Sequence, residues 1–238
     1  MKYMNNVKAE ITEIFSSIQG EGIFLGAKQI FVRFKKCNLN CVFCDETRSS
    51  EPKEYTSIEL SRHIKAMDAE KGPHHSVSFT GGEPLLYWDF LEDLLKTMKK
   101  NRGFKSYLET NGTLPGELSN IIDLVDIVAM DFKLPSATGE REYWSEHAEF
   151  LKIASKKKVF VKAVVTPETN IEDIEKAIQL IKKSHKNIPF ILQPVSPVSP
   201  ADKSIDRDRL LKFLEVGSRN DFINMRVIPQ IHKILKVK

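Results

Sequence analysis

The sequence is poor in cysteine, has no strong excess of one charge and contains no long apolar run. Its three cysteines, an odd number confined to one short segment, exclude a framework of disulfides. No stretch approaches the ~18 consecutive apolar residues of a membrane span, and the first residues lack the apolar core of a secretory signal. Lys and Arg number 36 against 32 Asp and Glu, and this net charge of +4 does not favour a nucleic-acid partner. We therefore expect a soluble, cytoplasmic protein that acts without a membrane or a nucleic acid.

Hydrophobic residues make up 41% and charged residues 29% of the 238 positions, which is typical of globular proteins. No linker or repeat divides the chain, so we expect a single domain over residues 1–238. Apolar runs typical of strands alternate with segments of helical periodicity. The expected strands are 11–18, 29–34, 76–80, 105–110, 126–131, 158–165, 190–193 and 224–227, and the expected helices are 57–71, 88–100, 143–157, 171–185 and 205–217. Thr56 with Glu59 predicts a capping box for the first helix, and Thr169 or Asn170 a cap for the fourth.

This alternation predicts an α/β fold with a mostly parallel sheet and helical crossovers. About six strand–helix units are too few for a complete eightfold barrel, so we expect an open, partial βα barrel. Ligands of such folds bind at the carboxyl ends of the strands. Polar and glycine-rich segments follow these ends at residues 19–22, 35–48 (the cysteine loop), 81–84, 111–113, 132–135 and 194–196. Their coincidence at one sheet edge predicts the functional site.

The cysteine loop places three thiols close together, on Cys37, Cys41 and Cys44. One interpretation is a zinc site of the Cys₃His type. The nearest histidines are His63, His74 and His75, and none has the short spacing of a zinc knuckle. The other interpretation is an iron–sulfur cluster. Because a [4Fe–4S] cluster normally takes four cysteines, three would leave one iron with an open position for a substrate or cofactor.

The pattern Cys-x₃-Cys-x₂-Cys at residues 37–44, followed by Gly-Gly-Glu-Pro at 81–84, resembles the signature of the radical S-adenosylmethionine superfamily. Further segments resemble the 7-carboxy-7-deazaguanine synthase family within it. They are Ile-Phe-Ser-Ser-Ile-Gln-Gly-Glu-Gly at 14–22, Phe-Val-Arg-Phe at 31–34, Glu-Thr-Asn-Gly-Thr at 109–113 and Gln-Ile-His-Lys at 230–233. The resemblance therefore covers nearly the whole chain.

The resemblance implies a lyase with a [4Fe–4S] cluster on the three cysteines, S-adenosyl-L-methionine and Mg²⁺. It implies cleavage of S-adenosylmethionine to a radical that takes a hydrogen from 6-carboxy-5,6,7,8-tetrahydropterin. Ring contraction with release of ammonia then gives 7-carboxy-7-deazaguanine, for deazapurines such as queuosine or archaeosine. The cofactors supply the radical chemistry, and the protein supplies positioning and a dry pocket. A one-electron donor such as flavodoxin or ferredoxin and a homodimer are also implied.

The resemblance also assigns site residues by position, beginning with the three cysteines as cluster ligands. Cofactor contacts are expected from Phe43, Asp45, Gly81, Gly82, Asp131, Lys133, Gln193, Pro194, Val195 and Ser196. Substrate contacts are expected from Ile18, Gln19, Gly20, Glu21, Arg33, Thr80, His232 and Lys238, with the tail closing the pterin site. Two glycines without Cβ atoms would let the backbone approach the methionine amine, and a guanidinium suits the pterin carboxylate.

The Mg²⁺ ligand is one position where the chain departs from the family pattern. The family usually has Asp-Thr or Asp-Ser after the third cysteine, and this chain has Asp45-Glu46-Thr47. Glu46 would offer a hard carboxylate oxygen, and a bulged loop would bring in Thr47 instead. The metal could also be dispensable here.

Two smaller departures are Lys36 in place of a common glycine, and Asp-Phe-Lys at 131–133 in place of Ser-Pro-Lys. The second leaves the role of the Asp131 side chain open. Two other functions are also compatible with the cysteine loop. One is a radical activase that takes hydrogen from a glycine of a partner protein, and the other is a zinc-binding module without catalysis.

Overall fold

The computed structural model describes residues 7–44, 51–100, 103–184, 187–197 and 204–237. The strands among them form one nine-stranded sheet in the order β3-β1-β2-β4-β5-β6-β7-β8-β9. β1 (Lys8–Ile18) is antiparallel to both β2 (Lys28–Phe34) and β3 (Lys53–Thr56). All later neighbours are parallel, namely β2, β4 (Ser76–Gly81), β5 (Ser106–Thr110), β6 (Ile127–Asp131), β7 (Lys158–Val165), β8 (Phe190–Pro194) and β9 (Met225–Val227).

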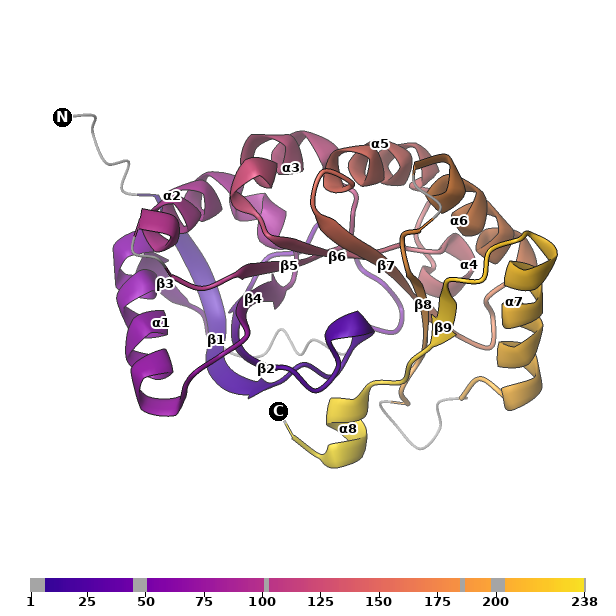
Figure 1. Ribbon diagram of the computed structural model, residues 1–238, viewed down its shortest axis with the longest axis horizontal. Coiled ribbons are helices and arrows are strands. Elements are labelled where there is room, and N and C mark those ends of the chain that lie inside the picture. The colour runs from indigo at the N-terminus through magenta and orange to yellow at the C-terminus, as the bar shows by residue number, and fades with distance from the viewer. Residues whose placement is uncertain (1–6, 45–50, 101–102, 185–186, 198–203, 238) are drawn as a thin grey trace.

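Helices cover the outer side of the curved sheet, as an arc in Figure 1. They are α1 (Ser57–Lys71), α2 (Trp88–Lys100), α3 (Pro115–Ile121), α5 (Trp144–Ala154), α6 (Ile171–Ser184) and α7 (Arg207–Arg219), with short turns η2 (Pro84–Tyr87), η3 (Ile122–Leu124) and α4 (Pro135–Thr138). On the concave side lie η1 (Gly22–Phe24) and α8 (Ile231–Leu235) (Figure 1). Because β3 and β9 end the strand order without pairing to each other, the barrel is open. The expected α/β partial barrel is therefore confirmed.

The outer core lies between the sheet and the helices. On α2 the buried side chains follow helical periodicity, at Phe90, Leu91, Leu94, Leu95 and Met98. All five residues of β6 are buried, as expected for a central parallel strand covered on both faces. None of the helices in the described ranges is long and apolar enough to cross a membrane.

A second, smaller core fills the concave side, and we call it the inner cluster. It consists of Tyr107, Ile127, Ala129, Phe160 and Ile191, with Ile23 and Phe24 of η1 packed against it. The Phe24 ring lies 5.7 Å from the Tyr107 ring and 6.4 Å from the Phe160 ring. Gly22 has a φ of +66°, and any Cβ there would overlap the Phe160 ring, so this turn needs glycine. The inner cluster fills the barrel toward the amino ends of the strands and leaves space at their carboxyl ends.

Most local expectations are confirmed, and the differences have physical reasons. The capping box of Thr56 and Glu59 is present, and Asn170 caps α6 by accepting from the Asp173 backbone N–H. Thr169 is not the cap, because its hydroxyl accepts from the backbone N–H of Thr166. The helix expected at 205–217 begins later, at Arg207, because Asp206 caps it, and it runs on to Arg219. The short elements β3, α3, α4 and α8 were not expected.

Candidate active site

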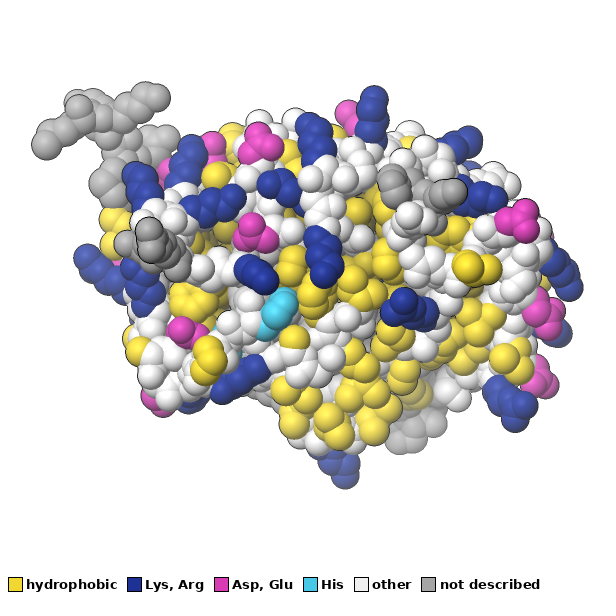
Figure 2. Space-filling model, in the orientation of Figure 1, with side chains coloured by type: hydrophobic (Ala, Val, Ile, Leu, Met, Phe, Trp, Pro, Cys, Tyr) yellow, Lys and Arg dark blue, Asp and Glu magenta, His cyan; other side chains and the backbone are white. Residues whose placement is uncertain are grey.

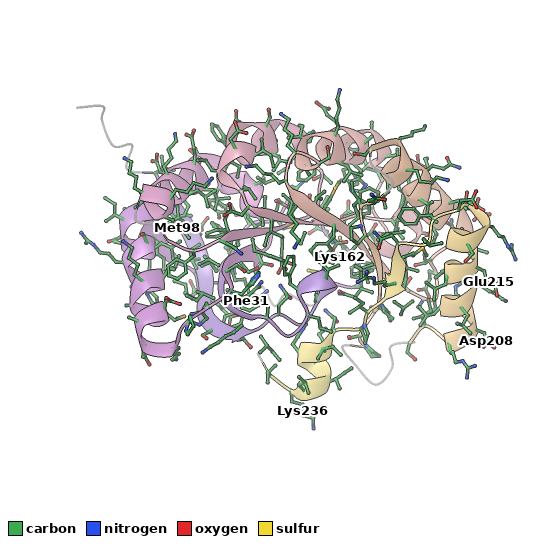
Figure 3. All side chains as sticks on the ribbon, in the orientation of Figure 1. Phe31, Met98, Lys162, Asp208, Glu215 and Lys236 are labelled. Atoms are coloured by element: carbon green, nitrogen blue, oxygen red, sulfur yellow. The ribbon has the colours of Figure 1, made fainter. Side chains whose placement is uncertain are left out.

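Four neighbouring strands each place a polar side chain two residues beyond an apolar one. The pairs are Tyr107 and Glu109 on β5, Ala129 and Asp131 on β6, Phe160 and Lys162 on β7, and Ile191 and Gln193 on β8. Because side chains alternate along a strand, the two members of a pair share a face. The apolar members belong to the inner cluster, and the polar members form a layer above it that lines a cavity of about 370 Å³. Figure 3 shows Lys162 at the concave side of the sheet.

This cavity, called the pocket from here on, gathers most of the predicted site residues. Its lining includes Ile18, Gln19, Gly20, Glu21, Arg33, Cys37, Cys41, Phe43, Cys44, Thr80, Gly81, Gly82, Asp131, Lys133, Gln193, Val195, Ser196 and His232. Pro194 is not part of the lining, because it follows Gln193 in β8 and alternation turns its side chain to the other face. The predictions for Asp45, Glu46, Thr47 and Lys238 lie outside the described residues. Glu109, Lys162 and Gln230 also line the pocket, although no role was expected for them from the sequence.

The cysteine loop follows the carboxyl end of β2, and its three thiols are free. Burial raises the pKa of Cys37 and raises that of Cys41 to about 11, so both are neutral thiols until a metal replaces the proton. The backbone N–H of Val42 donates to the Thr138 carbonyl at 3.0 Å, which fixes the loop on α4. The loop is therefore tied to β2 where it begins and to α4 at Val42.

Asn38 joins the cysteine loop to the end of β5. Its amide donates to the Thr113 hydroxyl at 2.9 Å and accepts from the Asn111 amide at 2.9 Å. The buried carboxylate of Glu83 accepts from the Asn111 backbone N–H at 2.7 Å and from the Thr110 hydroxyl at 2.8 Å. The glutamate of the Gly-Gly-Glu-Pro motif thus holds the β5 loop, which in turn holds Asn38 next to Cys37.

The two glycines of this motif allow the end of β4 to pack closely against the backbone of residues 34–36. The Gly82 N–H donates to the Phe34 carbonyl at 2.8 Å, and the Glu83 N–H to the Lys36 carbonyl at 2.6 Å. Gly81 has a φ of +111°, and a Cβ at either glycine would overlap the backbone of residues 34–36. We expected the glycines to allow contact with a cofactor amine. The structure adds a second reason, which is that they let β4 meet the start of the cysteine loop.

Gln19 and Glu109 form a hydrogen-bonded wall on one side of the pocket. The Gln19 amide donates to Glu109 at 2.9 Å and to Gln29 at 3.1 Å, and its oxygen accepts from the Glu21 N–H at 3.0 Å. Glu109 also accepts from the Ser78 and Thr80 hydroxyls, at 2.9 Å and 3.0 Å. Gln19 is therefore occupied by protein partners, and its clearest effect is to orient Glu109 and the Glu21 backbone.

Arg33 lies in the same wall, on β2 beside the cysteine loop. Its Nε donates to Glu13 at 3.1 Å, and its guanidinium lies 5.8 Å from the centre of the Phe15 ring. The side chain is 23% exposed, so it is neither a free surface arginine nor a fully buried one. This placement is compatible with the expected contact to a ligand carboxylate.

A chain of charged groups crosses the floor of the pocket. Gln230 donates to one Glu21 oxygen at 2.8 Å, and the Lys162 ammonium lies 2.5 Å from the other. Lys162 also lies 3.5 Å from Asp131, which is paired with Lys133 at 3.0 Å. Burial alone would raise the pKa of Glu21, but Lys162 and Gln230 lower it to about 2. Burial lowers the pKa of Lys162, and its two carboxylate partners raise it above the usual value.

Two buried acceptors in the pocket lack a protein partner among the described residues. They are Asp131 Oδ1 and Gln193 Oε1. Since buried polar atoms are normally hydrogen-bonded, both are suited to a ligand that carries N–H or O–H groups. Together with three free thiols at the pocket wall, this set fits a [4Fe–4S] cluster and an adjacent S-adenosylmethionine.

The C-terminal tail returns to this site. The Ile231 N–H donates to the Gly20 carbonyl at 3.0 Å, and a Cβ at Gly20 would overlap the His232 ring. Ile234 and Leu235 of α8 are exposed, as is Val237 just beyond its end, and Figure 2 shows hydrophobic side chains gathered there. The tail is thus anchored through its first residues, at the pocket.

The histidines considered as zinc ligands have other roles. His63 is on α1, while His74 and His75 precede β4, at the edge of the sheet opposite the cysteines. The two ring nitrogens of His74 lie 2.7 Å from Asp68 and 2.8 Å from Ser16. Over the described ranges, no three side chains of His, Cys, Asp or Glu converge where a single metal ion could bind.

Comparison with known proteins agrees with this geometry. The Radical SAM superfamily model matches residues 31–184. A 7-carboxy-7-deazaguanine synthase from Geobacter sulfurreducens is 36% identical, over 98% of this chain and 99% of that protein. One from Methanothermobacter thermautotrophicus is 34% identical, also over 98% and 99%.

The solved structure of QueE from Escherichia coli shares the fold, with a TM-score of 0.63 and 23% identity over 94% of both chains. These likenesses go against the activase and zinc-module alternatives. The cysteine loop, the Gly-Gly-Glu-Pro turn and the full-length relatives lead to one conclusion: this chain belongs to the 7-carboxy-7-deazaguanine synthase family of the radical SAM superfamily.

Proposed function

We propose that this chain converts 6-carboxy-5,6,7,8-tetrahydropterin into 7-carboxy-7-deazaguanine with release of ammonia, as one catalytic unit in deazapurine biosynthesis. The observation that carries the proposal is a pocket that joins three free thiols to a layer of largely buried polar and charged side chains. When bound, a [4Fe–4S] cluster and S-adenosylmethionine supply the carbon radical that takes a hydrogen from the substrate. The chain itself binds, orients and excludes water.

Glu21, Glu109 and Arg33 form the pterin end of the pocket. A pterin presents neighbouring N–H groups, and a carboxylate held in place by protein donors accepts such groups well. Glu21 is kept ionised by its partners, and Glu109 is oriented by Gln19 and two hydroxyls. The Arg33 guanidinium supports the assignment of the pterin carboxylate to the β2 side of the pocket.

The cysteines, Asp131 and Gln193 form the cofactor end. Cys37, Cys41 and Cys44 would hold the cluster as thiolates, and three protein ligands would leave one iron free to bind a cofactor. The unpartnered oxygens of Asp131 and Gln193 would accept hydrogen bonds from the amine or the ribose hydroxyls of S-adenosylmethionine. The inner cluster below keeps this end dry, which protects a reactive carbon radical from quenching.

We further propose that Mg²⁺ assists the reaction through Glu46 or Thr47, that a flavodoxin or ferredoxin donates the electron, and that the chain is a homodimer. Glu46→Ala should lower the Mg²⁺ dependence of turnover more than Thr47→Ala if the carboxylate is the ligand. The reverse order would assign the metal to a bulged loop. Light scattering of the reconstituted protein tests the homodimer.

The function is tested by anaerobic reconstitution with iron and sulfide, followed by incubation with the pterin, S-adenosylmethionine and a reductant. Mass spectrometry should detect 7-carboxy-7-deazaguanine and 5′-deoxyadenosine. Cys41→Ala, which removes one cluster ligand, is the matched inactive control. A wild-type protein that shows the spectrum of a four-iron cluster but forms no deazapurine would overturn the proposal.

A further inference from the structure

Lys162 has no role in the assignments above, although it occupies the centre of the pocket's charged groups. Its ammonium lies 2.5 Å from Glu21 and 3.5 Å from Asp131, and its side chain is 12% exposed. Glu21 comes from the turn after β1 and Asp131 from the end of β6. In the part of the chain that the structure describes, Lys162 is the one cation that contacts both carboxylates.

The two carboxylates have different second partners. Glu21 is also bound by the neutral amide of Gln230, and Asp131 by the ammonium of Lys133. Without Lys162, Asp131 would therefore keep a lysine, whereas Glu21 would be a largely buried anion with the Gln230 amide and only the more distant charge of His232. Buried charges without a counter-ion are strongly unfavourable, so Glu21 would take up a proton or move toward water.

We propose that Lys162 is a positioning residue that holds Glu21 and Asp131 in one arrangement, and so prepares the pterin end and the cofactor end of the pocket together. This inference rests on the proposed function, which assigns Glu21 to the pterin and Asp131 to the cofactor. A pair held at 2.5 Å fixes which Glu21 oxygen faces the lysine and leaves the other lone pairs for a ligand. At Asp131 both lysines lie next to Oδ2, which leaves the buried Oδ1 as the acceptor for a bound ligand.

The strand pattern explains why a lysine can do this at residue 162. Phe160 lies two residues earlier on the same face and packs in the inner cluster, which supports the base of the lysine stem. In the parallel ladder Asp131 is the register partner of Lys162, so their distance is set by strand spacing. Glu21 approaches from the opposite side through η1, whose Phe24 packs on the same Phe160.

The test compares Lys162→Met with Lys133→Met, which removes the second cation of Asp131 but nothing from Glu21. Both variants and the wild type are reconstituted anaerobically. Equilibrium dialysis then measures the Kd of S-adenosylmethionine and, in separate cells without reductant, the Kd of the pterin. Cluster content and Tm are recorded for each protein.

Lys162→Met should raise the Kd of both S-adenosylmethionine and the pterin, each by about tenfold or more, because Glu21 and Asp131 both lose the lysine that they share. Lys133→Met should raise the Kd of S-adenosylmethionine by a similar factor and that of the pterin by less than about threefold, since Glu21 keeps Lys162. Lys162→Arg should recover part of both affinities, because a guanidinium can span two carboxylates. If Lys162→Met does not fold, Lys162→Gln is measured in its place and should show the same loss at both ends.

A lower Tm with unchanged Kd values for both ligands would show that the ion pairs of Lys162 only stabilise the fold, and it would overturn the inference. A loss at one end alone would overturn it as well. Failure of the proposed function has a different signature, because the wild type itself would then bind no pterin or form no deazapurine. The two failures are therefore distinguishable in one set of samples.

Discussion

Replacement of Glu83 tests whether its buried carboxyl group is protonated or ionised in the folded protein. It is fully buried and accepts from the N–H groups of Leu85 and Asn111, at 3.0 and 2.7 Å, and from the Thr110 hydroxyl at 2.8 Å. In Glu83→Gln the amide NH₂ must face one of these donors. One buried N–H then loses its acceptor, which costs about 1–3 kcal/mol. Glu83→Ala leaves two N–H groups unpaired, and we expect about 2–6 kcal/mol by the same reasoning.

The stability of the protein should also depend on pH through Glu83. Burial raises the pKa of Glu83 to about 7, against the lowering effect of its hydrogen bonds, while the unfolded value is 4.5. Between these values the folded protein binds the extra proton, so its stability falls as pH rises. The contribution of Glu83 is fully present below pH 4.5 and is lost as pH rises through about 7. Relative to Glu83→Gln, the wild type should lose roughly 2–3 kcal/mol of stability between pH 5 and pH 8.

Urea denaturation of the cluster-free proteins, followed by circular dichroism at both pH values, measures this difference. Thr110→Val is the control that keeps the carboxyl group. Because the Thr110 hydrogen bond lowers the pKa of Glu83, its loss should leave a fall in stability between pH 5 and pH 8 at least as large as that of the wild type. A gap between wild type and Glu83→Gln that is the same at pH 5 and pH 8 would refute the reasoning. Glu83 would then carry the same charge throughout, and its three donors would outweigh burial.

Three further variants probe the loops around the pocket. Gly82→Ala should reduce the iron bound per chain after reconstitution, because its Cβ meets backbone of the cysteine loop, whereas Gly116→Ala has open space and should bind iron like the wild type. Asn38→Ala should lose about 1–3 kcal/mol in urea denaturation and bind less iron, since two hydrogen bonds to the β5 loop disappear. Gln230→Ala should raise the Kd of the pterin by about three- to tenfold, because Glu21 loses one orienting bond, and an unchanged Kd in dialysis would count against a role for the tail.

The fold was largely predictable because the parallel strands are continuous apolar runs bounded by turn residues. The elements that were missed have no such signal. β3 has four residues, two of them exposed, and it exists because it pairs with the start of β1. α8 buries no residue, and its position depends on contacts of Gln230 and Ile231 with the turn after β1. Such contacts join residues about two hundred positions apart, which local periodicity does not report.

The site was predictable where motifs and strand ends coincide, and less so where a side chain depends on a distant partner. Arg33 and the cysteines were identified from motifs near strand ends. Lys162 was not, because a lysine within an apolar strand is usually directed to solvent, and its partner Glu21 is 141 positions away. Glu109 was quoted within a motif without a role, since only the structure brings Gln19 within 2.9 Å of it.

Glu109 and Lys162 nevertheless share a pattern along the strands. On four adjacent strands the inward face carries an apolar residue and then, two positions later, a polar one that reaches the pocket. The apolar layer excludes water from below, and in the resulting low dielectric each ion pair or hydrogen bond above it is stronger than at the surface. The polar layer must be internally paired for the same reason, because an unpaired charge there would be costly. Glu109 and Lys162 satisfy this pairing, whereas Asp131 and Gln193 each keep one buried oxygen without a partner in the described chain. The pairing therefore distinguishes Glu109 and Lys162, which are bound to other protein groups, from Asp131 and Gln193, which each have an oxygen that is available to a ligand.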